Sequence, residues 1–197
     1  MGSFSYGVYD RLRHLIFPFG MVLQEVPEKS SVLDIGCGYG TFPIMVARER
    51  NPSRVLGVEI DRERVTAARK NSEGLGNVSF VAQDISRFES EERFDVITCL
   101  DVLHHVPGRL QKGVIERAGN LLKPGGALVL VEIDTRPFLK YVWNYMHDVV
   151  MTRSSGMRYV SRERCLEMVR SGGLRVASVR DASRFMYSRY MITARKG

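Results

Sequence analysis

A glycine-rich turn between a buried strand and a helix is the feature that most constrains this chain. The segment SVLDIGCGYG at residues 31–40 is an apolar run followed by Gly36, Gly38 and Gly40 at alternate positions. Glycines in such a turn let a ligand approach the backbone closely, and the helix that follows offers unpaired N–H groups with a partial positive charge. The pattern favours a nucleotide-type ligand without identifying it.

The spacing of the turn and its neighbouring acid discriminate between two such ligands. In the dinucleotide motif G-x-G-x-x-G the third small residue comes three positions after the second glycine, where this chain has Thr41. Asp34 beside the turn would repel a diphosphate, but it suits the ammonium and sulfonium charges of S-adenosylmethionine. The residues therefore favour S-adenosylmethionine over a dinucleotide.

Two more acids end the next two apolar runs. Glu59 lies near the end of the run at 54–60, where a carboxylate can accept hydrogen bonds from both ribose hydroxyls. Asp84 ends the run at 77–84, where a carboxylate can accept from an adenine amine. Because the carboxyl ends of parallel strands meet at one edge of a sheet, we expect Asp34, Glu59 and Asp84 to converge on one crevice.

Short apolar runs alternate with amphipathic helical patterns through the centre of the chain. The runs lie at 31–36, 54–60, 77–84, 93–100 and 127–134, and the helical patterns at 40–50, 61–74 and 108–122. This alternation predicts an α/β fold with a parallel sheet covered on both faces. A helix at 161–171 and a closing β-hairpin follow, and Asp61 and Ser161 are the expected helix caps.

The 197 residues are expected to form a single domain, because no linker or repeat interrupts the pattern. We divide it into an N-terminal helical lid at 1–28, a cofactor-binding core at 29–134, a substrate lid segment at 135–160, and a closing helix and hairpin at 161–197. Aromatic residues at helical spacing in the two lid segments favour an apolar or aromatic acceptor. The alternative is that these faces simply pack as core.

Composition favours a cytoplasmic protein, with no apolar run near the roughly 18 residues that a membrane span requires. Cys37, Cys99 and Cys165 lie far apart and outside metal-binding spacings, so reduced thiols are expected. Residues 151–197 hold 11 Lys or Arg and 3 acids, a net charge of +8, and so account for the whole net charge of +7 of the chain. Three interpretations of this charge stay open: a solvated basic face, a surface that binds RNA, and transient contact with an anionic membrane surface.

Five motifs resemble, in order and spacing, those of the class I S-adenosylmethionine-dependent methyltransferases, especially the quinone and small-molecule methylating branch. They are VLDIGCGYG, VLGVEID, VSFVAQDI, FDVITCLDVLHHV and LLKPGGALVLVEID, and they cover about residues 31–134. The resemblance implies a Rossmann-like, seven-stranded, mostly parallel sheet with an antiparallel last strand. It implies S-adenosylmethionine as cofactor and S-adenosylhomocysteine as product. The implied cofactor-binding residues are Asp34, Gly36, Cys37, Gly38, Gly40, Glu59, Ile60, Asp84, Ile85 and Leu100.

The segment LDVLHHVP after the fourth run carries the candidate catalytic residues. Asp101, His104 and His105 fall where the resemblance places residues beside the departing methyl group. A hydroxyl acceptor benefits from a general base, and histidine is the usual one. For His105 we favour a structural role, with its ring packed under the strand and bonded to backbone, whereas for His104 both roles stay open. One carboxylate with two imidazoles is a poor magnesium set, so no metal is expected.

The sequence therefore predicts a methyltransferase that acts by in-line displacement on a small apolar, aromatic or lipid-like acceptor, with O-methylation favoured. An RNA methyltransferase that uses the arginine-rich C-terminal face is the alternative. Its arginines are spread over a helix and two strands instead of clustering, which speaks against it. A catalytically inactive cofactor-binding protein is a further alternative, which the intact glycines and acids disfavour.

Overall fold

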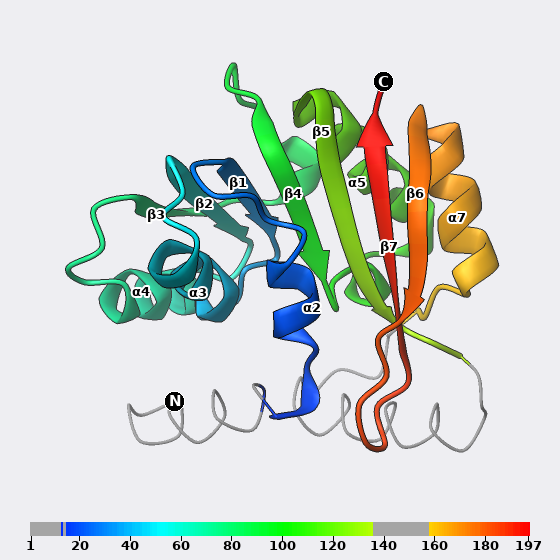
Figure 1. The fold of residues 1–197 in the computed structure, drawn as a ribbon, viewed down its shortest axis with the longest axis horizontal. Helices are drawn as coiled ribbons and strands as arrows, with labels where there is room; N and C mark the ends of the chain where they lie inside the picture. Colours follow the sequence, from blue (N-terminus) through cyan, green and yellow to red (C-terminus); the bar gives the residue numbers. More distant parts are fainter. Residues whose placement is uncertain (1–12, 14, 136–157) are drawn as a thin grey trace.

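In the computed structural model, which describes residues 13, 15–135 and 158–197, a seven-stranded sheet forms the centre of the chain (Figure 1). The strands are β1 (Ser31–Ile35), β2 (Arg54–Glu59), β3 (Val78–Ala82), β4 (Phe94–Leu100), β5 (Leu122–Ile133), β6 (Leu174–Asp181) and β7 (Arg189–Lys196). Their order is β3-β2-β1-β4-β5-β7-β6, with β1 to β5 parallel and β7 antiparallel between β5 and β6. The predicted fold class is confirmed.

Helices cover both faces of the sheet (Figure 1). One face carries α2 (Phe19–Leu23), α3 (Thr41–Glu49) and α4 (Arg62–Asn71), and the other carries α5 (Gly108–Leu121) and α7 (Arg162–Ser171). In β1, Val32 packs in the cluster with α2 and α3, whereas Leu33 and Ile35 pack with α5 and α7. Successive side chains of a strand point to opposite faces, so a strand buried on both sides is apolar throughout.

Side-chain caps begin two of the helices at the expected residues. One Asp61 oxygen accepts from the backbone N–H groups of Glu63 and Arg64, at 2.8 and 3.2 Å, and so starts α4. The Ser161 hydroxyl accepts from the N–H of Arg164 at 3.2 Å and starts α7. Both caps satisfy N–H groups that the first turn of a helix leaves without a partner.

Two elements differ from the sequence prediction at their ends. β5 begins at Leu122 and not at 127, because Leu122 already pairs with Phe94 before a register shift. In the helical lid predicted at 1–28, α2 begins only after Pro18, and Leu15 is exposed. Residues 1–12 and 14 of that segment and residues 136–157 of the predicted substrate lid lie outside the described residues. Within the described part of the chain, no helix has the length and apolar character needed to cross a membrane.

Gly57 in β2 tests how tightly the α3 and α4 face is packed. A Cβ at Gly57 would lie 2.6 Å from Phe80 Cδ1 and 2.7 Å from Cys37 Sγ. We expect Gly57→Ala to lower the free energy of unfolding by about 1–3 kcal/mol, because overpacking displaces these neighbours. Gly113 in α5 is the control, since a Cβ there meets nothing within 4 Å. Gly113→Ala should raise stability by up to about 1 kcal/mol. Urea unfolding of both variants checks this, and an equal loss in the two would contradict it.

Candidate active site

A cavity of about 470 Å³ opens at the carboxyl ends of β1 to β4. In the sheet, β1 has β2 on one side and β4 on the other, so the strand order reverses at β1. Open α/β sheets leave a crevice for ligands at such a point. The volume lies within the range of small-molecule sites. The glycine turn, the ends of β2 and β3, the loop after β4, and parts of the N-terminal segment and β7 all contribute to its wall.

The glycine turn is held against the end of β2 by backbone hydrogen bonds. Gly36 N–H donates to the Val58 carbonyl at 2.8 Å, and Gly38 N–H donates to Glu59 Oε2 at 3.0 Å. The other oxygen of Glu59 accepts from Asp61 N–H at 3.1 Å. A carboxylate has about four acceptor positions, so Glu59 retains capacity for ligand hydroxyls where it lines the cavity.

Two of the glycines have different reasons to lack a side chain. Gly36 has a φ of 70°, and a Cβ there would lie 2.5 Å from Val102 Cγ2, so the loop after β4 packs directly on it. Gly38 has a φ of 55°, but a Cβ there would have Arg13 Nη1 as its nearest neighbour, at 3.9 Å. The backbone at Gly38 therefore borders open space in which a ligand fits.

The ends of β2 and β3 form the part of the wall that suits a nucleoside. Asp84 Oδ1 accepts from Ser86 N–H at 2.8 Å and caps the short 3₁₀ helix η1 (Ile85–Arg87). Ile60, directly after β2, is 67% exposed and lines the cavity together with the buried Ile85. Apolar side chains beside the carboxylates of Glu59 and Asp84 match a ring with an exocyclic amine and a sugar with two hydroxyls. This donor and acceptor set fits S-adenosylmethionine.

Three predicted cofactor residues lie behind the cavity wall. Asp34 is buried within β1, where its Oδ1 accepts from Thr98 Oγ1 at 2.5 Å. Cys37 is buried in the cluster under α3 and α4, and burial raises the pKa of its thiol. Gly40 has a φ of 83° and packs on the Phe80 ring. Asp34 lies one residue before the end of β1, and its side chain is buried and does not line the cavity. For these three residues, direct contact with the cofactor stays a prediction.

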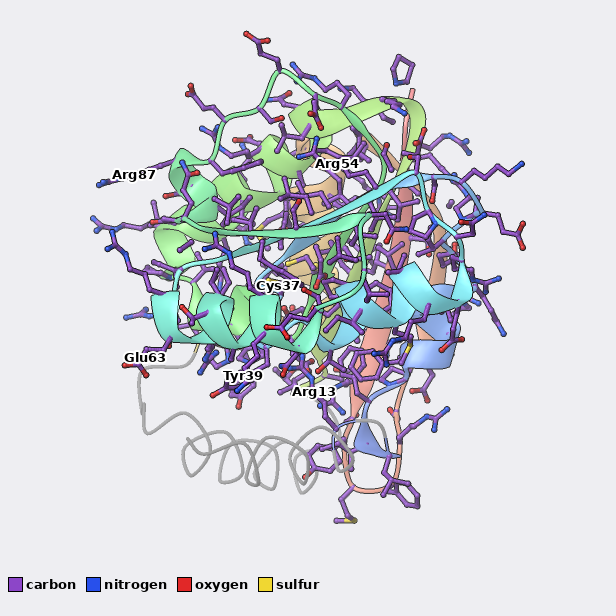
Figure 2. The ribbon with its side chains drawn as sticks, turned by 90° about the vertical axis from the view of Figure 1, so that its left-hand side faces the viewer. Arg13, Cys37, Tyr39, Arg54, Glu63 and Arg87 are labelled. Atoms are coloured by element: carbon purple, nitrogen blue, oxygen red, sulfur yellow. The ribbon has the colours of Figure 1, made fainter. Side chains whose placement is uncertain are left out.

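Arginines contribute to the wall at three places that the sequence analysis did not single out. Arg13, Arg64 and Arg189 line the cavity alongside the acids. Arg64 lies over the Tyr39 ring at 5.7 Å, and Arg13 lies 5.7 Å from the Phe17 ring centroid. Figure 2 shows Cys37 further inside the molecule than Tyr39 and Arg13. The expected pocket of acids is thus a pocket of mixed charge.

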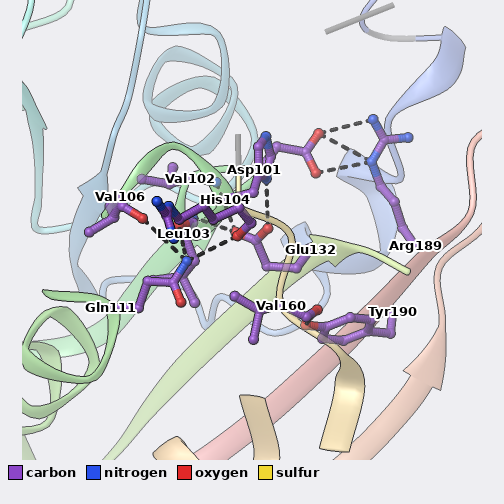
Figure 3. A network of polar contacts seen from close by, with 11 residues as sticks. Asp101, Val102, Leu103, His104, Val106, Gln111, Glu132, Val160, Arg189 and Tyr190 are labelled. Atoms are coloured by element: carbon purple, nitrogen blue, oxygen red, sulfur yellow. Dashed lines mark hydrogen bonds and ion pairs between the residues drawn. The ribbon is translucent and has the colours of Figure 1, made fainter. Parts of the chain in front are cut away.

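Asp101 forms a partly buried ion pair with one of these arginines (Figure 3). Arg189 Nε and Nη2 donate to the Asp101 carboxylate at 3.1 and 2.9 Å, and Nη1 donates to the Ile16 carbonyl at 3.0 Å. The guanidinium also lies over the Phe17 and Tyr187 rings, at 5.2 and 5.0 Å from their centroids. Asp101 has a φ of 55°, unusual for a residue other than glycine. The ion pair ties the loop after β4 to β7 and the N-terminal segment.

The two histidines of the same loop differ in burial. His104 lies in the 3₁₀ turn η2 (Leu103–His105), is 1% exposed, and has Nδ1 2.7 Å from Glu132 Oε2. His105 is exposed, and its ring centroid lies 4.1 Å from that of His104. The expectation that the His105 ring packs under the strand is wrong, because the turn directs His104 inward instead. Both residues line the cavity. Among the described residues, no three His, Cys, Asp or Glu form a group that could hold a metal ion.

Comparison with known proteins identifies the chain's relatives. A model of a methyltransferase domain family matches residues 27–176. A ubiquinone biosynthesis O-methyltransferase from Coxiella burnetii is 28% identical over 177 residues, which cover 84% of this chain and 74% of that protein. A protein of the same name from Xanthomonas campestris pv. campestris is 35% identical over 109 residues, which cover 54% of this chain and 44% of that protein.

Solved structures share the fold at lower identity. Magnesium protoporphyrin IX methyltransferase from Synechocystis PCC 6803, with bound S-adenosylmethionine, superposes with a TM-score of 0.70 at 21% identity, over 91% of this chain and 78% of that one. A [4+2]-cyclase superposes with a TM-score of 0.75 at 19% identity, over 95% and 81% of the two chains. At such identities the likeness establishes the fold, on which different chemistries occur.

Asp34 makes the stability of the fold depend on pH. Burial raises its pKa to about 7, although the hydrogen bond from Thr98 opposes this. Because the folded state holds the proton more tightly than the unfolded state, the carboxyl destabilises the fold increasingly as pH rises from about 4 to about 7. Asp34→Asn should therefore gain about 2 kcal/mol over the parent protein between about pH 5 and about pH 8.

Chemical denaturation at the two pH values measures this gain. Glu73→Gln, at an exposed position just after α4, is the control, because it removes a carboxylate that lies on the surface. A difference between Asp34→Asn and the parent that is the same at both pH values would rule out the buried carboxyl as its cause.

Ile60 should contribute to cofactor affinity and little to stability. Removing its apolar surface in Ile60→Ser should weaken S-adenosylmethionine binding about tenfold, the equivalent of about 1.4 kcal/mol of lost contact. Its exposure in the structure predicts an unchanged free energy of unfolding. Val179→Ser removes a similar side chain, 39% exposed on β6 and away from the cavity, and should leave the affinity unchanged. Isothermal titration calorimetry compares them, and equal affinities of the two variants would refute the prediction.

Proposed function

Because the chain belongs to the methyltransferase domain family and is an S-adenosylmethionine-dependent methyltransferase, we propose that it methylates a hydroxyl group of a small apolar or aromatic acceptor. The observation that carries this proposal is His104, an imidazole held by the Glu132 carboxylate in the wall of a largely apolar cavity. Such a pair suits the removal of a proton from a hydroxyl. The curated relatives named as ubiquinone biosynthesis O-methyltransferases support an acceptor of this class.

When bound, S-adenosylmethionine supplies a methyl group that is already electrophilic. In the proposal, the backbone at Gly36 and Gly38 borders its methionine part, and Glu59 accepts from the ribose hydroxyls. Ile60 and Ile85 cover the adenine ring, and Leu100 closes the wall at the end of β4. Asp84 accepts from the adenine amine. These residues all line the cavity, which supports their assignment.

The acceptor would occupy the part of the cavity beside the loop after β4. Ile16, Phe17, Val106, Pro107 and Leu110 are among the apolar side chains that line the cavity. Burying an aromatic or aliphatic acceptor against them provides affinity and excludes water from the reacting groups. Ile16 and Phe17 belong to the segment at 1–28, so we also propose that this segment acts as a lid. The proposed substrate lid at 135–160 lies almost wholly outside the described residues.

His104 would act as the general base. Its imidazole takes the hydroxyl proton as the acceptor oxygen becomes nucleophilic. Asp101 would hold the loop after β4 in place and would not act as a base, because its carboxylate already accepts hydrogen bonds from Arg189. His105, exposed at the rim, would contact the acceptor as it enters.

Replacing His104 separates chemistry from cofactor binding. His104→Asn should lower turnover by about 10²–10⁴-fold, the range for loss of a general base. Affinity for S-adenosylmethionine should stay within about twofold, because the residues proposed to hold it are unchanged. His105→Asn should reduce turnover less. Single-turnover kinetics and calorimetry test the pair, and equal rates in His104→Asn and the parent would remove the base from the proposal.

The acceptor class is tested by labelling. The enzyme is incubated with S-adenosylmethionine carrying a labelled methyl group, an organic-solvent extract of small metabolites and total RNA. We expect the label in an apolar, hydroxyl-containing fraction, at a rate that changes little with salt. Label in RNA, with a rate that falls steeply as salt rises, would overturn the proposal in favour of an RNA substrate.

A further inference from the structure

Glu132 occupies the end of β5 and was not among the predicted catalytic residues. We propose that it is a positioning residue for His104, which fixes the imidazole in the tautomer with the proton on Nδ1 and the lone pair on Nε2. The inference rests on the proposed function, since it explains how His104 is kept ready to accept a proton. It concerns a different residue and has a readout that needs no acceptor.

Three hydrogen bonds join the Glu132 carboxylate to the loop after β4. Oε1 accepts from the backbone N–H groups of Val102 and Leu103, at 2.9 and 2.6 Å, and Oε2 lies 2.7 Å from His104 Nδ1. Glu132 is 0% exposed and His104 is 1% exposed. Both backbone contacts are ones in which the carboxylate accepts, and an ionised carboxylate can only accept hydrogen bonds. Nδ1 therefore donates.

The loop that carries His104 is held from its other side as well (Figure 3). Gln111 Nε2 donates to the carbonyls of Leu103, Val106 and Arg158, at 2.9, 3.2 and 3.1 Å. Arg158 N–H donates to the His104 carbonyl at 2.8 Å. The Tyr159 ring stacks on the His104 ring, with centroids 5.2 Å apart and planes at 19°. The imidazole is thus held in position as well as in tautomer.

This arrangement has a chemical consequence for the base. With Nδ1 protonated, the lone pair on Nε2 is the one that can take a proton when the O–H bond of an acceptor breaks. The imidazolium formed by the new Nε2–H bond then lies against the Glu132 carboxylate, which stabilises its charge. A glutamate that merely anchored the loop would need the two backbone hydrogen bonds but not the contact with Nδ1.

Glu132→Gln separates these two roles. The glutamine carbonyl can keep both backbone hydrogen bonds, while its NH₂ group faces Nδ1 and forces that nitrogen to accept. The proton of His104 should therefore move to Nε2. Long-range ¹H–¹⁵N NMR of the labelled full-length protein reads the tautomer directly, and loss of the signal in His104→Asn assigns it. We expect the Nδ1–H form in the parent and the Nε2–H form in Glu132→Gln.

Turnover and cofactor binding provide the second readout. Glu132→Gln should lower the rate of methyl transfer to the labelled fraction at least about 100-fold, with affinity for S-adenosylmethionine within about twofold of the parent. Asp134→Asn is the matched control. This acid lies two residues further along the chain and pairs with Arg162 at 2.6 Å, outside the His104 network. It should change neither the tautomer nor the rate.

Three results would overturn the inference. They are an Nε2–H tautomer in the parent, an unchanged tautomer in Glu132→Gln, and a parallel loss of cofactor affinity and rate, which indicates a structural role. If Glu132→Gln does not fold, as judged by thermal unfolding, the tautomer in the parent still decides. If the parent labels no hydroxyl acceptor, the proposed function fails. The tautomer measurement still tests the inference on Glu132 by itself, because it needs no acceptor.

Discussion

The close approach of two loops is the constraint on which the site depends. The glycine turn after β1 and the loop after β4 meet where the strand order reverses, and Val102 lies where a side chain of residue 36 would be. Backbone hydrogen bonds from Val102 and Leu103 to Glu132 then join this contact to the end of β5. These contacts join β1, β4 and β5 near their carboxyl ends, where the cavity opens.

Buried charge in the site is matched by partners within the chain. Asp101 pairs with Arg189, and the Glu132 carboxylate accepts from two backbone N–H groups and lies 2.7 Å from His104 Nδ1. An isolated buried charge costs several kcal/mol, whereas a paired and hydrogen-bonded one is tolerated. The loop after β4 is therefore held in place by contacts within the chain. Such preorganisation is what transfer of an already reactive methyl group requires, since alignment is its main demand.

Individual residues show how far the sequence could predict the site. Glu59 and Asp84 line the cavity because each lies at the end of a parallel strand, a position that apolar periodicity reveals. Asp34 also lies near the end of a parallel strand, but only packing shows that its carboxyl group is buried and meets Thr98. His104 and His105 are adjacent in the sequence, and the 3₁₀ turn alone determines which of them is buried.

The sequence by itself determined the order of strands and helices, the caps at Asp61 and Ser161, and the glycine turn. These features depend on interactions between residues a few positions apart, so the periodicity and backbone preferences of short segments are enough to predict them. Only the tertiary structure decided that Asp101 pairs with Arg189, 88 residues away, and that His104 meets Glu132, 28 residues away. Those contacts depend on the register of neighbouring strands and on the direction of each side chain, which are set when the sheet and its helices pack together.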